Sequence, residues 1–198
     1  NCDKKWFPYC KGGTFRKWYG NREYTINWYK DGLELKNTEG AVIRNSDFYF
    51  LEGLSYSDVS SGSFGLRYYG YGFVFDSCGP MFFPSDSELL VTDLLAVLNS
   101  VVANYFYKFL CPTMHFTQSS VAKFPVLFVN KGIQKRNAKI VSQNITLSKL
   151  DWDSHETSWD FKENPLVEIM KEDKIPSAQT GGFKSQNQRF EAAKMMVP

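Results

Sequence analysis

The feature that most constrains the fold of this 198-residue chain is a helical period in its middle third. Between Leu90 and Phe109, apolar side chains recur at steps of three and four residues, which is the spacing of one helix face. Such a helix is stabilised mainly by packing that face on other apolar groups. The residues of the expected face are Leu90, Val91, Leu94, Leu95, Val97, Leu98, Val101, Val102, Tyr105, Phe106 and Phe109.

The ends of this segment are marked as well. Ser85 and Glu88 have the spacing of a capping box, in which the two side chains satisfy free N–H groups at a helix start. Pro112 cannot continue a helix, and Asn99 with Ser100 interrupts the apolar pattern. We therefore expect a pair of helices that is divided at these two polar residues.

The first 84 residues have the period of strands. The stretch EYTINWY, residues 23–29, alternates in polarity, and KDG, residues 30–32, is typical of a turn, so a β-hairpin is predicted here. Residues 46–79 are rich in Phe, Tyr and Val and are interrupted by glycines, which mark turns, bulges or close backbone approaches. The pattern predicts an α+β fold, in which a strand-rich part precedes a helix pair.

Three further patterns follow the helix pair. TQSSVAKF, residues 117–124, has the composition of a helix start, and KFPVLFV, residues 123–129, has that of a short strand. QKRNAKIVSQNITLS, residues 134–148, predicts a polar helix. The expected division of the chain is a domain of residues 1–130, a helical and acidic connecting segment of residues 131–175, and a tail of residues 176–198.

Charge is distributed unevenly, although the formal net charge is only +2. Residues 111–150 contain basic side chains and no Asp or Glu, so their local field is positive. Residues 151–175 are acidic and contain two tryptophans. Because the overall balance is near neutral, any DNA-binding face must be local.

The cysteines and the apolar stretches indicate the compartment. Cys2, Cys10, Cys78 and Cys111 are spaced neither as zinc ligand pairs nor as a dense disulfide framework, which predicts reduced thiols. Polar residues interrupt the longest apolar stretch, and the first ten residues lack the apolar centre of a signal peptide. We expect a soluble, cytoplasmic fragment of a longer protein, without membrane contact.

The sequence contains no recognisable catalytic constellation. His115 and His155 are the only histidines, and neither lies in a nucleophile signature. Residues 151–156 resemble metal ligands but lack a second cluster, so a solvated or tryptophan-anchored acidic turn is the simpler interpretation. The GxG of YYGYGF lacks the third glycine of a dinucleotide site, and no Asn-Pro-Pro-aromatic motif is present to hold an extruded base. We expect no catalytic residue, metal or cofactor in this chain.

Basic and aromatic loops remain as the candidate functional feature. RKWYGNR (16–22), SSGSFGLRYY (60–69) and HFTQSS (115–120) supply side chains that neutralise phosphates or read base edges. Each stretch also has a structural interpretation, which stays open. In that interpretation Trp18 and Tyr19 are core or hairpin residues, Arg67 is an ion-pair partner, and Gln118 and Ser119 are helix caps.

Four blocks of the sequence strongly resemble, in this order, the C-terminal region of the PglX-like adenine-specific DNA methyltransferases of BREX phage-defence systems. Related type IIG restriction-modification enzymes share parts of the pattern. The most specific blocks are FRKWYGN and DWDS-ETSWDF, and little of the resemblance extends beyond residue 166. The four blocks are residues 6–32, 45–76, 94–126 and 150–166.

The resemblance implies a target-recognition domain, similar to the domains of type I specificity subunits, that reads double-stranded DNA through loops. The implied fold is α+β, with a mixed, mostly antiparallel twisted sheet packed with a helix pair. An upstream catalytic domain of the parent protein would flip and methylate adenine with S-adenosylmethionine as methyl donor. The methyl-donor site and the catalytic motif of the family lie outside the blocks that this chain matches. The implied partners are therefore double-stranded DNA, the upstream methyltransferase domain and other subunits of the defence system.

Residue types and resemblance together predict two groups of DNA contacts. The expected phosphate contacts are Arg16, Lys17, Arg22, Lys123, Lys135 and Arg136. The expected base or groove contacts are Asn21, Arg67, Tyr68, His115 and Gln118. The alternative is a protein-interaction module, in which the acidic segment with Trp152 and Trp159 docks a partner of the defence complex.

Overall fold

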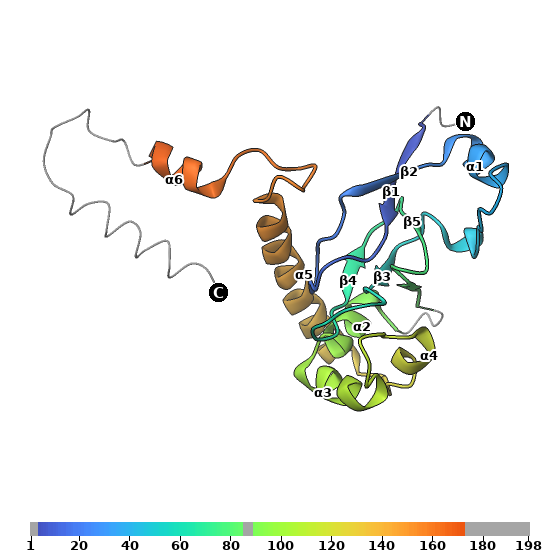
Figure 1. Ribbon diagram of the computed structural model, residues 1–198. Coiled ribbons are helices and arrows are strands. Elements are labelled where there is room, and N and C mark those ends of the chain that lie inside the picture. The colour runs from blue at the N-terminus through green and yellow to red at the C-terminus, as the bar shows by residue number, and fades with distance from the viewer. Residues whose placement is uncertain (1–3, 85–88, 173–198) are drawn as a thin grey trace, which may run out of the picture. The chain divides into compact units, whose positions relative to one another are not determined.

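The computed structural model describes residues 4–84 and 89–172 (Figure 1). Residues 1–162 form one compact unit, and residues 163–198 form a second, in which the helix α6 (Pro165–Glu172) is described. The first unit contains β1 (Trp6–Cys10), β2 (Tyr24–Asn27), α1 (Tyr29–Lys36), a 3-10 turn (Ser46–Phe48), β3 (Gly53–Ser55), β4 (Arg67–Tyr69), β5 (Val74–Phe75), β6 (Met81–Phe82), α2 (Val91–Leu98), α3 (Val101–Leu110), α4 (Gln118–Val121) and α5 (Lys131–Asp153).

The strands form two three-stranded sheets. In the first, β1 pairs antiparallel with β2 and parallel with β5; in the second, β3 pairs antiparallel with β4 and with β6. The α+β class is confirmed, with two small sheets where one was expected. Lys30, Asp31 and Gly32 have positive φ and make the predicted turn. The hairpin prediction is wrong, because the chain continues into α1 and β2 pairs with the preceding strand β1.

The predicted division of the helix pair is confirmed. α2 ends before Asn99, and Ser100 begins α3, where its hydroxyl accepts a hydrogen bond from the N–H of Ala103 (3.1 Å). The capping-box pattern of Ser85 and Glu88 lies outside the described residues.

The prediction of one shared apolar face is wrong for α3. α2 buries Leu95 and Leu98, but Val101 and Phe109 of α3 are 85% and 68% exposed. The physical reason is the break at residues 99–100, which reorients the chain, so that α3 packs on the core through Ala103 and Tyr107 instead.

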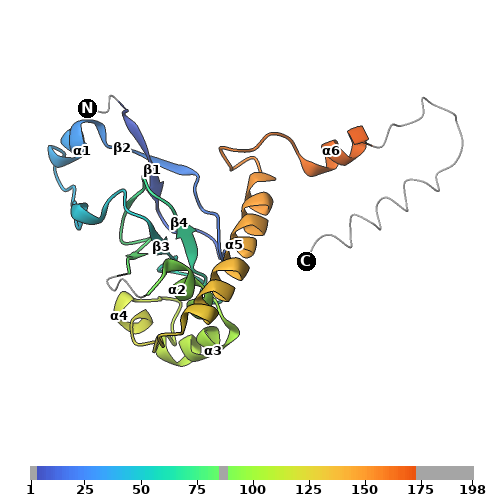
Figure 2. The same cartoon turned by 180° about the vertical axis from the view of Figure 1, so that it is seen from behind.

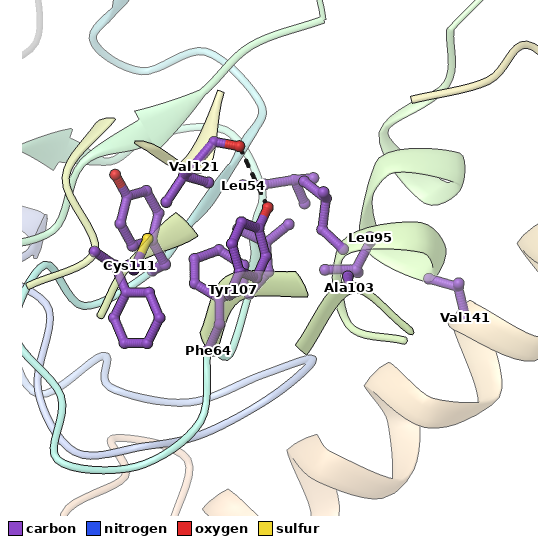
Figure 3. Packing of buried hydrophobic residues seen from close by; sticks show 12 residues of the cluster. Leu54, Phe64, Leu95, Ala103, Tyr107, Cys111, Val121 and Val141 are labelled. Atoms are coloured by element: carbon purple, nitrogen blue, oxygen red, sulfur yellow. Dashed lines mark hydrogen bonds between the residues drawn. The ribbon is translucent and has the colours of Figure 1, made fainter. Parts of the chain in front are cut away.

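The main core joins the helices to the second sheet. Figure 3 shows Leu95 of α2, Ala103 and Tyr107 of α3 and Val141 of α5 in one cluster with Leu54 of β3. The hydroxyl of Tyr107 donates to the carbonyl oxygen of Val121 (3.4 Å), so the buried phenol has a polar partner. Most of the members are fully enclosed, which makes this cluster sensitive to any loss of volume.

The segments after residue 116 are confirmed in part. The expected helix start forms α4, capped by Thr117, and the polar helix forms α5, whose cap Asn130 accepts from the N–H of Ile133 (3.0 Å). The strand predicted at residues 123–129 is absent from the described structure. Pro125 has no N–H to donate to a sheet. Phe124 and Val126 pack on the core, whereas Leu127 and Phe128 are exposed.

Two further predictions concern the redox state of the cysteines and the absence of a membrane-spanning helix. Within residues 4–84 and 89–172, Cys10, Cys78 and Cys111 are free thiols, as expected; Cys2 lies outside these ranges. In the same ranges, no helix combines the length and the apolar character that crossing a bilayer requires.

We expect Leu95→Ala to lower the free energy of unfolding by about 2–5 kcal/mol, because it leaves a cavity in the enclosed main core. Urea unfolding followed by far-UV circular dichroism measures this change. The matched control is Val42→Ala, at a position that is 71% exposed, which should stay within about 0.5 kcal/mol of the parent. Equal losses in both variants would contradict the assignment of the core.

Candidate nucleic-acid interface

The RKWYGNR stretch, residues 16–22, belongs to the loop that connects β1 to β2. In space this loop lies beside β4 and contacts α5 (Figures 1 and 2). The N–H of Trp18 donates to the carbonyl oxygen of Leu66 (2.9 Å), and the N–H of Tyr68 donates to that of Trp18 (2.9 Å). Trp18 therefore forms an isolated parallel β-bridge with Arg67 at the edge of β4. Gly65 is required here, because a Cβ atom at this position would lie 2.6 Å from the carbonyl oxygen of Arg16.

Arg16 attaches the loop to the last turn of α5. Its Nη1 donates to Oδ2 of Asp151 (2.7 Å), and its guanidinium carbon lies 4.9 Å from the ring centroid of Trp152, which is buried. Gly20, at φ +128°, leaves the space for this stack, since a Cβ atom there would lie 2.5 Å from Cδ of Arg16. We call these contacts the Arg16–Trp152 clamp.

Lys149 strengthens the same junction. Its Nζ donates to the carboxylates of Asp153 (2.6 Å) and Asp160 (2.7 Å) and lies 5.3 Å from the ring centroid of Tyr19. Burial lowers the pKa of Lys149, but the two hydrogen-bonded carboxylates outweigh this effect and raise it; the same contact lowers the pKa of Asp160. Both shifts favour the charged pair at neutral pH.

The other polar residues of the loop also have partners within the chain. Lys17 donates to the carbonyl oxygen of Asn99 (2.9 Å), and burial lowers its pKa. Asn21 is 2% exposed and donates to the carbonyl oxygen of Thr14 (2.8 Å). Arg22 donates to the carbonyl oxygen of Tyr68 (2.6 Å), and its guanidinium carbon is 3.9 Å from the ring centroid of Tyr19. These contacts give the loop a structural role.

A groove of about 370 Å³ separates the loop from α5. It is mainly apolar, with Phe15 and Leu147 half-exposed or exposed on its walls, and its cation Arg16 is already paired with Asp151. The groove therefore presents less free positive charge than the sequence of the loop indicates. Its lining residues are Phe15, Arg16, Lys17, Trp18, Tyr19, Leu147, Ser148 and Asp151.

The prediction of a base contact at Arg67 is corrected by its burial. Arg67 is 1% exposed in β4, and its Nη2 donates to the hydroxyl of Ser57 (3.2 Å). The nearby Cys10 offers no negative charge, because burial raises the pKa of its thiol. A guanidinium enclosed by protein cannot reach a base edge, so Arg67 supports the core instead. Its neighbour Tyr68 donates to Glu52 (2.5 Å), and burial with this hydrogen bond raises the pKa of Tyr68 to about 12.

Free positive charge gathers on α5. Lys131, Lys135, Arg136 and Lys139 are exposed, and among the described residues no carboxylate lies within ion-pairing distance of them. They are spaced at one and at three to five residues, which places them on the face opposite to buried Val141. We call these four side chains the basic stripe.

The opposite face of α5 holds the helix on the molecule. Asn137 donates to Oδ1 of Asp93 in α2 (3.2 Å), Val141 enters the main core, and Trp152 completes the clamp. Because these anchors lie near both ends of the helix, the basic stripe has a fixed orientation on the first unit.

The remaining predicted contacts lie around α4. His115 is exposed, with Nδ1 3.4 Å from Oδ2 of Asp58, and Gln118 and Lys123 are exposed at the start of α4 and just after it. The structure thus divides the predicted sites into a buried or half-buried group, held by internal hydrogen bonds, and an exposed group of His115, Gln118, Lys123, Lys135 and Arg136. Among the described residues, no group of three or more His, Cys, Asp or Glu could hold a metal ion.

Sequence reasoning missed several residues of this region. Lys131 and Lys139 were not among the predicted contacts, although the absence of acids from residue 111 to 150 was a signal for them. Asp151 and Trp152 were placed in an acidic segment, but their contact with Arg16 was not foreseen. The available signal was that FRKWYGN and DWDS-ETSWDF are the two most specific blocks of the resemblance. In the structure these two blocks contact each other through Arg16, Asp151 and Trp152.

Comparison with known proteins agrees with the resemblance of the sequence. No family model matches the chain. It is 42% identical over 167 residues to the adenine-specific methyltransferase BrxX of Escherichia coli O9:H4 (strain HS), and 40% identical over 172 residues to the adenine-specific methyltransferase PglX of Lacticaseibacillus casei (strain Zhang). These matches cover 84% and 83% of the chain, but only 13% and 14% of the relatives. The chain is thus similar to a small part of each of these two adenine-specific methyltransferases.

We expect Trp152→Ala to lower the free energy of unfolding by about 3–5 kcal/mol, because it removes the buried half of the clamp. The matched control is Trp159→Ala, whose side chain is 57% exposed and which should change stability by less than about 0.5 kcal/mol. Urea unfolding measures both. If Trp159→Ala were the more damaging of the two, the assignment of the clamp would be wrong.

Proposed function

We propose that this chain is a DNA-binding part of an adenine-specific DNA methyltransferase, and that the basic stripe of α5 contacts the phosphate backbone of double-stranded DNA. The observation that carries the proposal is the contrast between two sets of cations. Arg16, Lys17 and Arg22 are bound within the chain, whereas the stripe is exposed and, within residues 4–84 and 89–172, forms no ion pair with a carboxylate. Exposed cations without acidic neighbours are what a polyanion requires.

The dimensions of the stripe suit a duplex. Lys131 and Lys139 are eight residues apart, which corresponds to about 12 Å along a helix and is close to the width of the major groove, about 12 Å. Lysine side chains are flexible point charges that adapt to phosphates without reading sequence. The stripe would therefore supply affinity and orientation.

Sequence-specific recognition is the finer part of the proposal. Of the predicted base contacts, His115 and Gln118 are exposed, and Lys123 can add a phosphate contact beside them. Tyr68 and Asn21 are held by internal hydrogen bonds, so we assign them to the scaffold. His115 and Gln118 are thus the candidates for reading a base edge.

Methyl transfer would take place elsewhere in the polypeptide. Both relatives are named adenine-specific methyltransferases, and the chain spans about one seventh of their length. We propose that the parent binds S-adenosylmethionine and flips adenine in a catalytic domain, and that this chain contributes no catalytic residue. Docking of another defence subunit on the acidic segment is a weaker alternative, because Trp152 is already buried by Arg16.

The test is the double variant Lys135→Gln/Arg136→Gln, with binding to a pool of random duplexes measured across a salt series. We expect weaker binding to all sequences alike, and a salt slope lower by about 2, because each lost phosphate contact lowers the slope by about 1. Fluorescence anisotropy with labelled duplexes gives both quantities.

The charge-matched control is Lys4→Gln/Lys5→Gln, which removes two neighbouring exposed cations from the start of β1. Figure 1 shows that this strand begins at the end of the first unit away from α3 and α4, where α5 starts. Its salt slope should equal that of the parent. Equal losses in both double variants would indicate a nonspecific charge effect and would contradict the stripe.

A further inference from the structure

Helix α3 is apolar over most of its circumference, and its polar side chains are Asn104 and Lys108. Its sequence is VVANYFYKFL, in which Lys108 is the only charged residue, and it already buries Ala103 and Tyr107 in the main core. A helix with so wide an apolar surface is normally enclosed by other protein. Here the outer side is open: Val101 is 85%, Val102 61%, Tyr105 60%, Phe106 47% and Phe109 68% exposed.

The exposed side chains form an ordered surface. Val101, Tyr105 and Phe109 follow one another at four-residue steps, and the ring centroids of Tyr105 and Phe109 lie 5.3 Å apart in an edge-to-face arrangement. Phe106 makes a second edge-to-face contact with Phe124 (5.8 Å), which extends the surface beyond the helix. We call Val101, Val102, Tyr105, Phe106 and Phe109 the α3 face.

The chemistry of the α3 face selects protein as its occupant. The face contains no acid and only Lys108 nearby, so it cannot neutralise a DNA backbone, which the basic stripe of α5 is suited to do. Exposed apolar patches rich in aromatic side chains are typical of protein interfaces. An apolar protein surface is therefore the complementary partner.

We infer that the α3 face packs against another part of the same methyltransferase polypeptide. This inference rests on the proposed function, in which the chain is one part of such a protein. The matched segment makes up 13% and 14% of the two relatives, so most of the length of each relative lies outside it and is available to cover the face.

The size of the face argues against a second copy of the chain. The ten residues of α3 extend over about 15 Å, whereas a stable interface between separate molecules buries about 800 Å² on each partner. A single helix face of this length offers much less. A contact within one polypeptide needs less area, because the connecting chain keeps the partners at an effective concentration in the millimolar range.

Cysteine labelling tests the inference. Val101→Cys and Phe109→Cys are compared in the isolated 198-residue chain and in the full-length polypeptide that carries this sequence, with peptide mass spectrometry to locate the modified thiols. We expect labelling in the full-length protein to be slowed about tenfold or more, which corresponds to an opening free energy of at least about 1.4 kcal/mol. Val42→Cys, at an exposed position away from α3, should react equally in both.

Three results would overturn the inference. The first is equal labelling of α3 in the isolated chain and in the full-length protein. The second is protection of α3 in the isolated chain that increases with protein concentration, which would indicate a second copy as the occupant. The third is protection in the isolated chain that is independent of concentration, which would indicate that the chain covers the face itself. Failure of the proposed function is distinguishable, because it would appear as unchanged DNA binding in the stripe variants of the isolated chain.

A second variant avoids dependence on labelling. Tyr105→Asp/Phe109→Asp should leave the unfolding midpoint of the isolated chain unchanged, since both side chains are more than half exposed there. In the full-length protein the same change should lower the melting temperature, because it places charges in an apolar interface. Tyr71→Asp, at a residue that is 74% exposed, should lower neither. A midpoint lowered equally in both proteins would contradict the inference.

Discussion

The attachment of α5 to the strand-rich half of the molecule is the interaction on which the rest of the first unit depends. A helix of this length with few apolar residues is stabilised mainly by tertiary packing. That packing comes from Val141 in the main core and from Trp152 beneath the guanidinium of Arg16. Loss of either contact would loosen the helix and with it the basic stripe, whose exposed cations form no ion pair among the described residues.

The charge of α5 changes from basic to acidic after residue 150, and this change gives the helix two roles, as a basic surface and as an anchor for the RKWYGNR loop. Up to Leu150 the helix contains no acid, so the cations on its outer face stay unpaired; after it, Asp151 and Asp153 bind Arg16 and Lys149. The two cation types suit these roles. Arginine is weakly hydrated and planar, which favours stacking on Trp152, whereas most of the stripe is lysine, whose mobile ammonium suits phosphates.

Much of the fold could be predicted from the sequence, because its signals were local. The divided helix pair, the turn at residues 30–32 and the polar helix follow from period and capping alone. The pairing of β2 and the role of RKWYGNR could not, because both depend on partners distant in sequence. Arg16 meets Asp151, 135 residues later, and no property of either residue alone distinguishes this contact from a phosphate contact. The burial of Arg67 was hidden for the same reason.

The two proposed surfaces are coupled through the core that they share. Tyr107, on the inner side of α3, and Val141, on the inner side of α5, belong to one cluster of enclosed side chains. Close-packed interiors transmit strain, so we expect a displacement of α3 to be passed on to α5. A partner that covers the α3 face would therefore also set the orientation of the basic stripe. Docking and DNA contact would then be geometrically linked, and the stripe could direct a duplex toward the catalytic domain that we propose for the rest of the polypeptide.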